Sequence, residues 1–71
     1  MKKAEEIFAL LSDVYGVSPW NLEQIEADLK QANTEYFYLY DDQALIGFLA
    51  LQDLAGELEI TQLAVKKAYQ G

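Results

Sequence analysis

The segment from Ala44 to Leu51 is apolar at every position and reads Ala-Leu-Ile-Gly-Phe-Leu-Ala-Leu. Side chains alternate between the two faces of a strand, so a strand with this sequence is apolar on both faces. Such strands normally have a covering layer on each side of their sheet. We therefore expect a cover on both sides of this strand, and a part that is missing from this chain or a partner must supply any layer that the chain itself does not.

Two helices are expected before this strand. Apolar residues recur every three or four positions near the amino terminus, which indicates a helix over residues 3–15. Gly16 suits the left-handed position that closes such a helix. Ser18 as N-cap and Pro19 at the first helical position predict a second helix over residues 19–31.

Three strands are expected after the helices, over residues 35–40, 44–52 and 57–65. Short turns separate them, which is typical of an antiparallel meander. The predicted class is therefore α/β, in the α+β arrangement, with two helices followed by three strands in one domain over residues 1–71. Three tyrosines alternate on one face of the first strand, where packing explains them best: Tyr36, Tyr38 and Tyr40.

The third predicted strand changes its apolar phase along its length. Leu58 and Ile60 share one parity, whereas Leu63 and Val65 share the other. One explanation is a β-bulge near Thr61-Gln62, which would bend the strand and open a cleft. The other is a strand end that is buried on both faces, and the sequence leaves both open.

Two short helices can cover only one face of the predicted sheet. The other face would present apolar residues of one parity from segment 44–51, together with rings from segment 36–40. Large exposed apolar patches are uncommon on soluble monomers, and an open edge strand invites pairing with another copy. We therefore expect a homodimer, with face-to-face packing favoured over edge pairing because Glu57 and Glu59 repel their counterparts.

Composition excludes several function classes. The chain has no cysteine and no histidine, so disulfides, thiolate catalysis, a Ser-His-Asp triad and a structural zinc site are excluded, and the carboxylates form no recognised metal motif. The net charge is −7, and no basic residue lies between Lys30 and Lys66, which disfavours nucleic acid and favours a cationic partner. No apolar stretch is long enough for a membrane span or a signal peptide, so a soluble cytoplasmic protein is expected.

The carboxyl-terminal third resembles a known family. Ile60-Thr61-Gln62-Leu63-Ala64-Val65, followed by Ala68-Tyr69-Gln70-Gly71, is the most specific part, and Ser18-Pro19-Trp20 and Ile46-Gly47-Phe48 agree with it. These residues resemble GNAT acetyltransferases, most of all the ribosomal-protein-alanine N-acetyltransferase branch. The resemblance covers nearly the whole chain.

The resemblance implies an acetyl-CoA-dependent N-acetyltransferase with a bulged and splayed third meander strand. Backbone groups of Leu63, Ala64 and Val65 would hold the pantetheine arm of acetyl-CoA. A Gln/Arg-x-x-Gly-x-Gly/Ala loop at a helix N-terminus would hold the pyrophosphate. Gln70 and Gly71 match the first two positions of that loop.

The resemblance also implies residues for the acceptor side of the reaction. Glu59 occupies a position where some members carry a glutamate that deprotonates the amine through water, although it also reads as an ordinary solvent-side strand residue. Ser18, Pro19 and Trp20 would border the acceptor cleft, although a capped helix start with an aromatic anchor explains them too. The acceptor would be a basic protein or peptide, steered by the acidic surface.

The chain departs from the family pattern at both ends. The opening strand of the family is missing or reduced to Met1-Lys2, and neither the complete phosphate loop nor the C-terminal half is present. We therefore expect a partial domain that binds acetyl-CoA weakly and does not catalyse alone, whether it is a truncated gene product, an isolated fragment or an engineered piece. The alternative function is a non-catalytic GNAT-like interaction module that self-associates or binds a partner.

Overall fold

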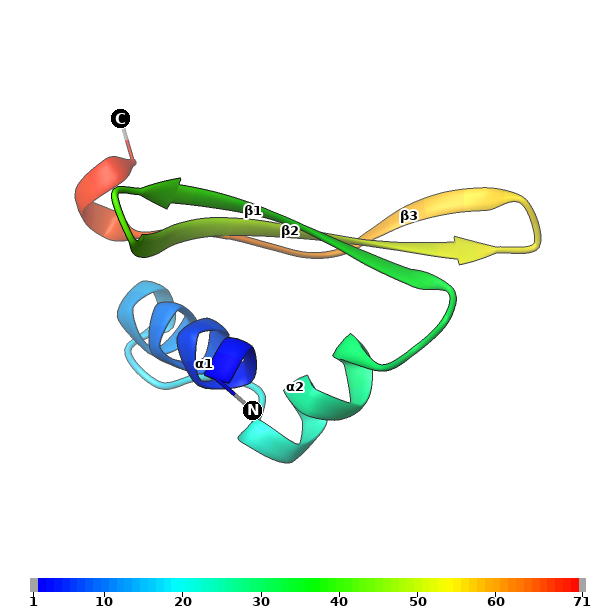
Figure 1. Cartoon of the computed structure of the whole chain (residues 1–71), viewed down its shortest axis with the longest axis horizontal. Helices are drawn as coiled ribbons and strands as arrows, with labels where there is room; N and C mark the ends of the chain where they lie inside the picture. Colours follow the sequence, from blue (N-terminus) through cyan, green and yellow to red (C-terminus); the bar gives the residue numbers. More distant parts are fainter. Residues whose placement is uncertain (1, 71) are drawn as a thin grey trace.

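The computed structural model describes residues 2–70, which form two helices followed by a three-stranded antiparallel sheet in the order β1-β2-β3. Both helices lie on one side of the sheet, and the opposite side carries no α-helix (Figure 1). The predicted order of elements is confirmed. The elements are α1 (Lys2–Tyr15), α2 (Leu22–Leu29), β1 (Thr34–Asp41), β2 (Ala44–Leu54), β3 (Glu57–Val65) and a 3-10 turn, η1 (Lys67–Tyr69).

The core lies between the helices and one face of the sheet. The apolar stripe of α1 and Ile25 of α2 pack onto Phe48 and Ala50 of β2 and Ala64 of β3. No polar side chain among the described residues is buried with them. The contributing residues of α1 are Ala4, Ile7, Leu10 and Leu11.

The turn after α1 follows the prediction, whereas the start of α2 does not. Gly16 has a φ of +81°, the left-handed conformation expected of a residue that closes a helix. The prediction that Ser18 caps the second helix is wrong, because α2 begins at Leu22 and its N-cap is Asn21. Asn21 and Gln24 form a reciprocal capping box, which satisfies two backbone N–H groups and fixes the helix start.

The predicted β-bulge in the third strand is confirmed. Ile60 pairs with Leu51 and Gln62 pairs with the next residue of β2, Ala50, so Thr61 is the extra residue. The bulge exchanges the faces of the residues on either side of it. For this reason the apolar residues before and after Thr61 lie on the same face of the sheet, although their sequence parity differs.

A second irregularity lies in β2 and has no signal in the sequence. Leu39 of β1 pairs with Gly47 and Tyr40 pairs with Leu45, which leaves Ile46 as the extra residue. Ile46 is buried, and its carbonyl accepts a hydrogen bond of 2.7 Å from the backbone N–H of Lys66. The uniform apolar character of this strand hides any change of phase.

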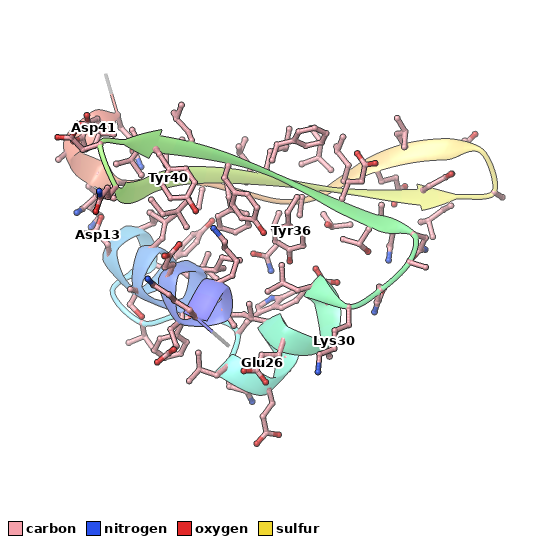
Figure 2. The ribbon with its side chains drawn as sticks, viewed as in Figure 1. Asp13, Glu26, Lys30, Tyr36, Tyr40 and Asp41 are labelled. Atoms are coloured by element: carbon pink, nitrogen blue, oxygen red, sulfur yellow. The ribbon has the colours of Figure 1, made fainter. Side chains whose placement is uncertain are left out.

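The rings of β1 are divided between the two faces of the sheet. Tyr36 and Tyr40 point toward the helices (Figure 2), and Tyr38 shares their parity, so these rings belong to the covered face. Of the rings in segment 36–40 that were expected on the uncovered face, the structure places Phe37 there, together with Leu39, because both occupy the alternate positions of the strand.

Candidate functional site

A pocket of about 270 Å³ lies where the connection between the helices meets the bulge of β3. It brings Pro19 and Trp20, which the resemblance assigns to the border of the acceptor cleft, together with Leu63, which the resemblance assigns to the pantetheine arm. Its lining residues are Leu11, Tyr15, Pro19, Trp20, Thr61, Gln62 and Leu63.

The connection between the helices holds Trp20 in place through local hydrogen bonds. The Ser18 hydroxyl donates to the Trp20 carbonyl at 2.6 Å and accepts from the Trp20 backbone N–H at 3.3 Å. The Trp20 ring is half-buried and packs against the core. Ser18 does not line the pocket, so its contribution to the site is to position Trp20.

The bulge supplies the polar groups of the pocket. The Thr61 hydroxyl donates to the Ala50 carbonyl at 3.3 Å, and Gln62 is half-buried beside it. None of the lining residues carries a charged side chain. A wall of apolar and neutral polar groups disfavours an ammonium ion relative to the neutral amine, because it solvates charge less well than water does.

The predicted cofactor residues of β3 follow directly after the bulge. Leu63 is exposed and lines the pocket, Ala64 is buried in the core, and Val65 is half-buried. Within residues 2–70, β3 is an edge strand and has a strand neighbour on one side only. Its outer edge therefore offers backbone groups to an extended, amide-bearing ligand such as a pantetheine arm.

The residues that follow β3 do not build a phosphate cradle within the described range. No α-helix follows β3 there, and η1 has only three residues. Gln70 donates from its side-chain amide to the Val65 carbonyl at 2.6 Å, which folds it back onto β3. Gly71 lies outside the described residues.

Glu59 lies before the bulge, on the same side of the sheet as the helices. It pairs with Gln52, whose side-chain amide donates to the Gln31 side chain beyond the end of α2 at 3.2 Å. Glu59 is exposed and does not line the pocket of Trp20. Its role as a base acting through water therefore stays a prediction.

A polar cluster that sequence reasoning missed lies between α1 and β1. The Lys3 ammonium donates to the Tyr40 hydroxyl, lies 3.4 Å from the Glu6 carboxylate and sits 4.4 Å from the centre of the Tyr38 ring. The Tyr40 bond and the Glu6 charge raise the pKa of Lys3 despite some desolvation. These contacts fasten the helix to the sheet and lie away from the pocket.

Two pocket residues from α1 were also missed, Leu11 and Tyr15. Leu11 is a core residue of α1 that also lines the pocket, and Tyr15 is the last residue of the same helix. A signal for Tyr15 exists in the sequence, because it directly precedes Gly16 and so stands where the chain turns toward Pro19. In residues 2–70 no three carboxylates gather as a metal site would require.

Comparison with known proteins gives one match. The family model described as the acetyltransferase (GNAT) family matches residues 4–71. No curated protein and no solved structure matches the chain. No helix in the described part of the chain is long and apolar enough to cross a membrane.

Proposed function

The chain belongs to the acetyltransferase (GNAT) family, and we propose that it forms part of the site of an acetyl-CoA-dependent N-acetyltransferase that acts on an amine. The observation that carries this proposal is the position of the β3 bulge. Thr61 displaces the strand beside Trp20, so the outer edge of Leu63–Val65 and the pocket meet at one place.

We propose further that the acceptor is a basic protein or peptide with a free N-terminal amine, such as a ribosomal protein. The net charge of −7 supports a cationic partner, because an acidic surface attracts basic chains over about 10 Å at moderate salt. The likeness of segment 60–65 and of Ala68 to Gly71 to the ribosomal-protein-alanine branch supports the N-terminal amine.

Each residue then has a part in the reaction. Bound acetyl-CoA would supply a thioester: the amine nitrogen would bond to its carbonyl carbon while the C–S bond breaks, and CoA would leave as the thiolate, which takes a proton from solvent. Backbone groups of Leu63 to Val65 bind the amide arm, and the Pro19-Trp20 wall holds the acceptor chain. Glu59, which lies upstream of the bulge on the face that the helices cover, takes the amine proton through a water molecule.

The 71-residue chain alone should bind acetyl-CoA weakly and turn over slowly or not at all. Most of the charge of acetyl-CoA is on its phosphates, and residues 66–70, which follow β3, provide neither a glycine loop nor an α-helix N-terminus to receive them. The Gln70 side chain is already hydrogen-bonded to the Val65 carbonyl. The cationic side chains nearest to Gln70 in the sequence are those of Lys66 and Lys67.

Calorimetry with acetyl-CoA and with S-acetylpantetheine, which lacks the phosphates, tests whether the chain binds the amide arm and not the phosphates. If only the amide arm is recognised, the two ligands bind with dissociation constants within about threefold of each other, both in the millimolar range. Backbone amide shifts should move at Leu63 to Val65 and stay constant at Glu57. Low-micromolar binding of acetyl-CoA alone would contradict the expected weakness, because it requires a phosphate site.

A second candidate function is a non-catalytic interaction module. It is favoured by the apolar face that the helices leave uncovered (Figure 1). A ligand that binds the folded state raises the melting temperature, so acetyl-CoA separates the two candidates. Stabilisation by millimolar acetyl-CoA with shifts at Leu63 to Val65 supports the transferase, and its complete absence supports the module.

A further inference from the structure

We propose that Asp13 of α1 is a positioning residue, which fixes the path of the chain after β3 and thereby the binding of the anionic end of acetyl-CoA. The inference rests on the proposed function and adds to it a residue that the family resemblance did not indicate. Asp13 does not line the pocket beside Trp20 and acts through the backbone N–H of Lys67.

The direction of the ligand along β3 follows from the position of that pocket. Transfer to an amine held at the Pro19-Trp20 wall requires the acetyl group at the bulge, where Leu63 lines the same pocket. The amide arm then runs along the outer edge of β3 toward Val65, the last residue of the strand. The phosphates lie at the far end of the arm and therefore come next to residues 66–70.

Hydrogen bonds, and not packing, hold residues 66–70 in place. None of the residues of η1 is buried. The backbone N–H of Lys66 donates to the carbonyl of Ile46 at 2.7 Å, and the Tyr69 hydroxyl donates to the carboxylate of Asp41. Both bonds connect the segment to the sheet.

Asp13 connects the same segment to a helix. Its carboxylate accepts a hydrogen bond of 3.1 Å from the backbone N–H of Lys67. Asp13 and Asp41 lie at one end of the molecule, beside η1 (Figure 2). Lys66, the N-cap residue of η1, provides no side-chain hydrogen bond to the turn. Asp13 therefore supplies from α1 the cap that the local sequence lacks.

The helix α1 is a suitable anchor because it also borders the pocket beside Trp20. Leu11 and Tyr15 line that pocket and lie about one turn apart on the helix. Asp13 lies about 200° around the helix from Leu11. It lines a separate pocket of about 370 Å³ together with Lys66. One helix thus contacts the pocket beside Trp20 with one face and the segment after β3 with another, which fixes the separation between the two.

Positioning and electrostatics predict opposite effects for Asp13. Its negative charge, like the charges of Asp41 and Asp42 at the same end of the molecule, repels phosphates. If charge alone mattered, any substitution that removes it would strengthen acetyl-CoA binding. If position matters, a neutral side chain that still accepts the Lys67 N–H is tolerated, and one that cannot accept it weakens binding.

Calorimetry separates these two effects in the polypeptide extended beyond Gly71 to a complete family domain. Asp13→Ala should raise the dissociation constant of acetyl-CoA about tenfold. It should leave that of S-acetylpantetheine unchanged, because the amide arm binds before the segment that Asp13 positions. Asp13→Asn, which keeps an acceptor oxygen, should stay within about twofold of the unaltered domain for both ligands.

Asp42→Asn is the matched control. It removes the same charge from the same end of the molecule, and Asp42 accepts none of the hydrogen bonds described above. Asparagine also tolerates the φ of +56° at this position. This variant should bind acetyl-CoA at least as tightly as the unaltered domain.

Hydrogen exchange of the Lys67 amide, measured by nuclear magnetic resonance in the 71-residue chain, needs no ligand. The exchange should be about fivefold faster or more in Asp13→Ala, and close to the unaltered rate in Asp13→Asn and Asp42→Asn. Far-UV circular dichroism checks that all variants stay folded. An unchanged exchange rate in Asp13→Ala would overturn the proposal.

The binding data can overturn it as well. Acetyl-CoA binding by Asp13→Ala that equals or exceeds that of the unaltered domain would do so, and equal losses for both ligands would assign Asp13 to general stability. An unaltered domain that binds neither ligand would refute the proposed function itself, and this inference with it.

Discussion

The hydroxyl of Tyr36 donates a hydrogen bond to the carboxylate of Asp28, which joins the first strand to the second helix. The Tyr36 ring also stacks on Phe48, with 5.7 Å between ring centres. Burial, followed by the bond to Asp28, raises the pKa of Tyr36 well above its usual value of 10.0. This contact fixes α2 over the sheet near the middle of β1.

The stability of the fold should therefore decrease above pH 10. The folded chain holds the Tyr36 proton more tightly than the unfolded chain does, so its contribution is complete below the unfolded pKa. As the pH rises further, the unfolded state loses this proton first and becomes favoured. Urea unfolding at several pH values checks the slope, which Tyr36→Phe should make shallower. An unchanged slope in this variant would assign the effect to Tyr38 or Tyr69, whose pKa values are also raised.

Deletion of Thr61 should be tolerated by the fold. Ile60 already pairs with Leu51 and Gln62 with Ala50, so removal of the extra residue leaves a regular ladder with every other side chain on its present face. The expected change in unfolding free energy is within about 1 kcal/mol. The pocket beside Trp20 should change, which a shift in the tryptophan fluorescence spectrum would report.

Deletion of Leu49 is the control for that experiment. Leu49 lies in a regular part of the central strand, where loss of one residue exchanges the faces of everything that follows. This variant should fail to fold by circular dichroism. If both deletions unfold the chain equally, the bulge is required for stability and the prediction for Thr61 is wrong.

Ala55→Asn should stabilise the second hairpin. Ala55 and Gly56 form its two-residue loop with φ values of +53° and +88°, and the Gly56 N–H donates to the Asp53 carboxylate at 3.1 Å. A left-handed conformation costs an alanine about 1 kcal/mol, and asparagine tolerates it better. Thermal unfolding should show a gain of about 0.5 to 1 kcal/mol. Ala55→Val, whose branched side chain suits this conformation least, should instead lower the melting temperature.

Glu59→Gln should slow acetyl transfer if Glu59 is the base. In a polypeptide extended to a complete family domain, turnover of a basic peptide near neutral pH should drop by about 100-fold or more, with unchanged affinity for acetyl-CoA. Glu57→Gln is the matched control, since it removes the same charge two residues earlier on the same strand. Equal pH–rate profiles for the unaltered enzyme and Glu59→Gln would identify Glu59 as a surface strand residue.

Local pattern was sufficient for most of the fold. The spacing of apolar residues located the first helix, and the β-propensity of segment 35–40 located the first strand, because both signals repeat over many residues. The change of apolar phase near Thr61 was also visible in the sequence, because the bulge keeps Ile60 and Leu63 on one face although their parity differs. Only the pairing of the strands decided that this change is a bulge and not a strand end buried on both faces. The N-cap of α2 could not be predicted from the sequence, because Ser18 and Asn21 are both good capping residues. Which of them caps the helix depends on the path of the chain between the helices.

The candidate site was predictable in part. Pro19, Trp20 and Leu63 were identified through family resemblance, but nothing local indicates that they share one pocket. Tyr15 and Leu11 join them only because α1 crosses the sheet next to the bulge. Glu59 is exposed and lies outside that pocket. Its exposure likewise depends on how far the helices extend over the sheet, which no local pattern shows.

The sequence by itself determined the order of elements, the apolar character of both faces of β2 and the change of apolar phase in β3. These properties depend on neighbouring residues in the chain, whose spacing sets which face each side chain occupies. Only the tertiary structure decided which face the helices cover, so that Tyr36 is enclosed and Phe37 is exposed. That choice rests on contacts between residues far apart in the chain, such as Tyr36 with Asp28 on a helix and with Phe48 on the next strand.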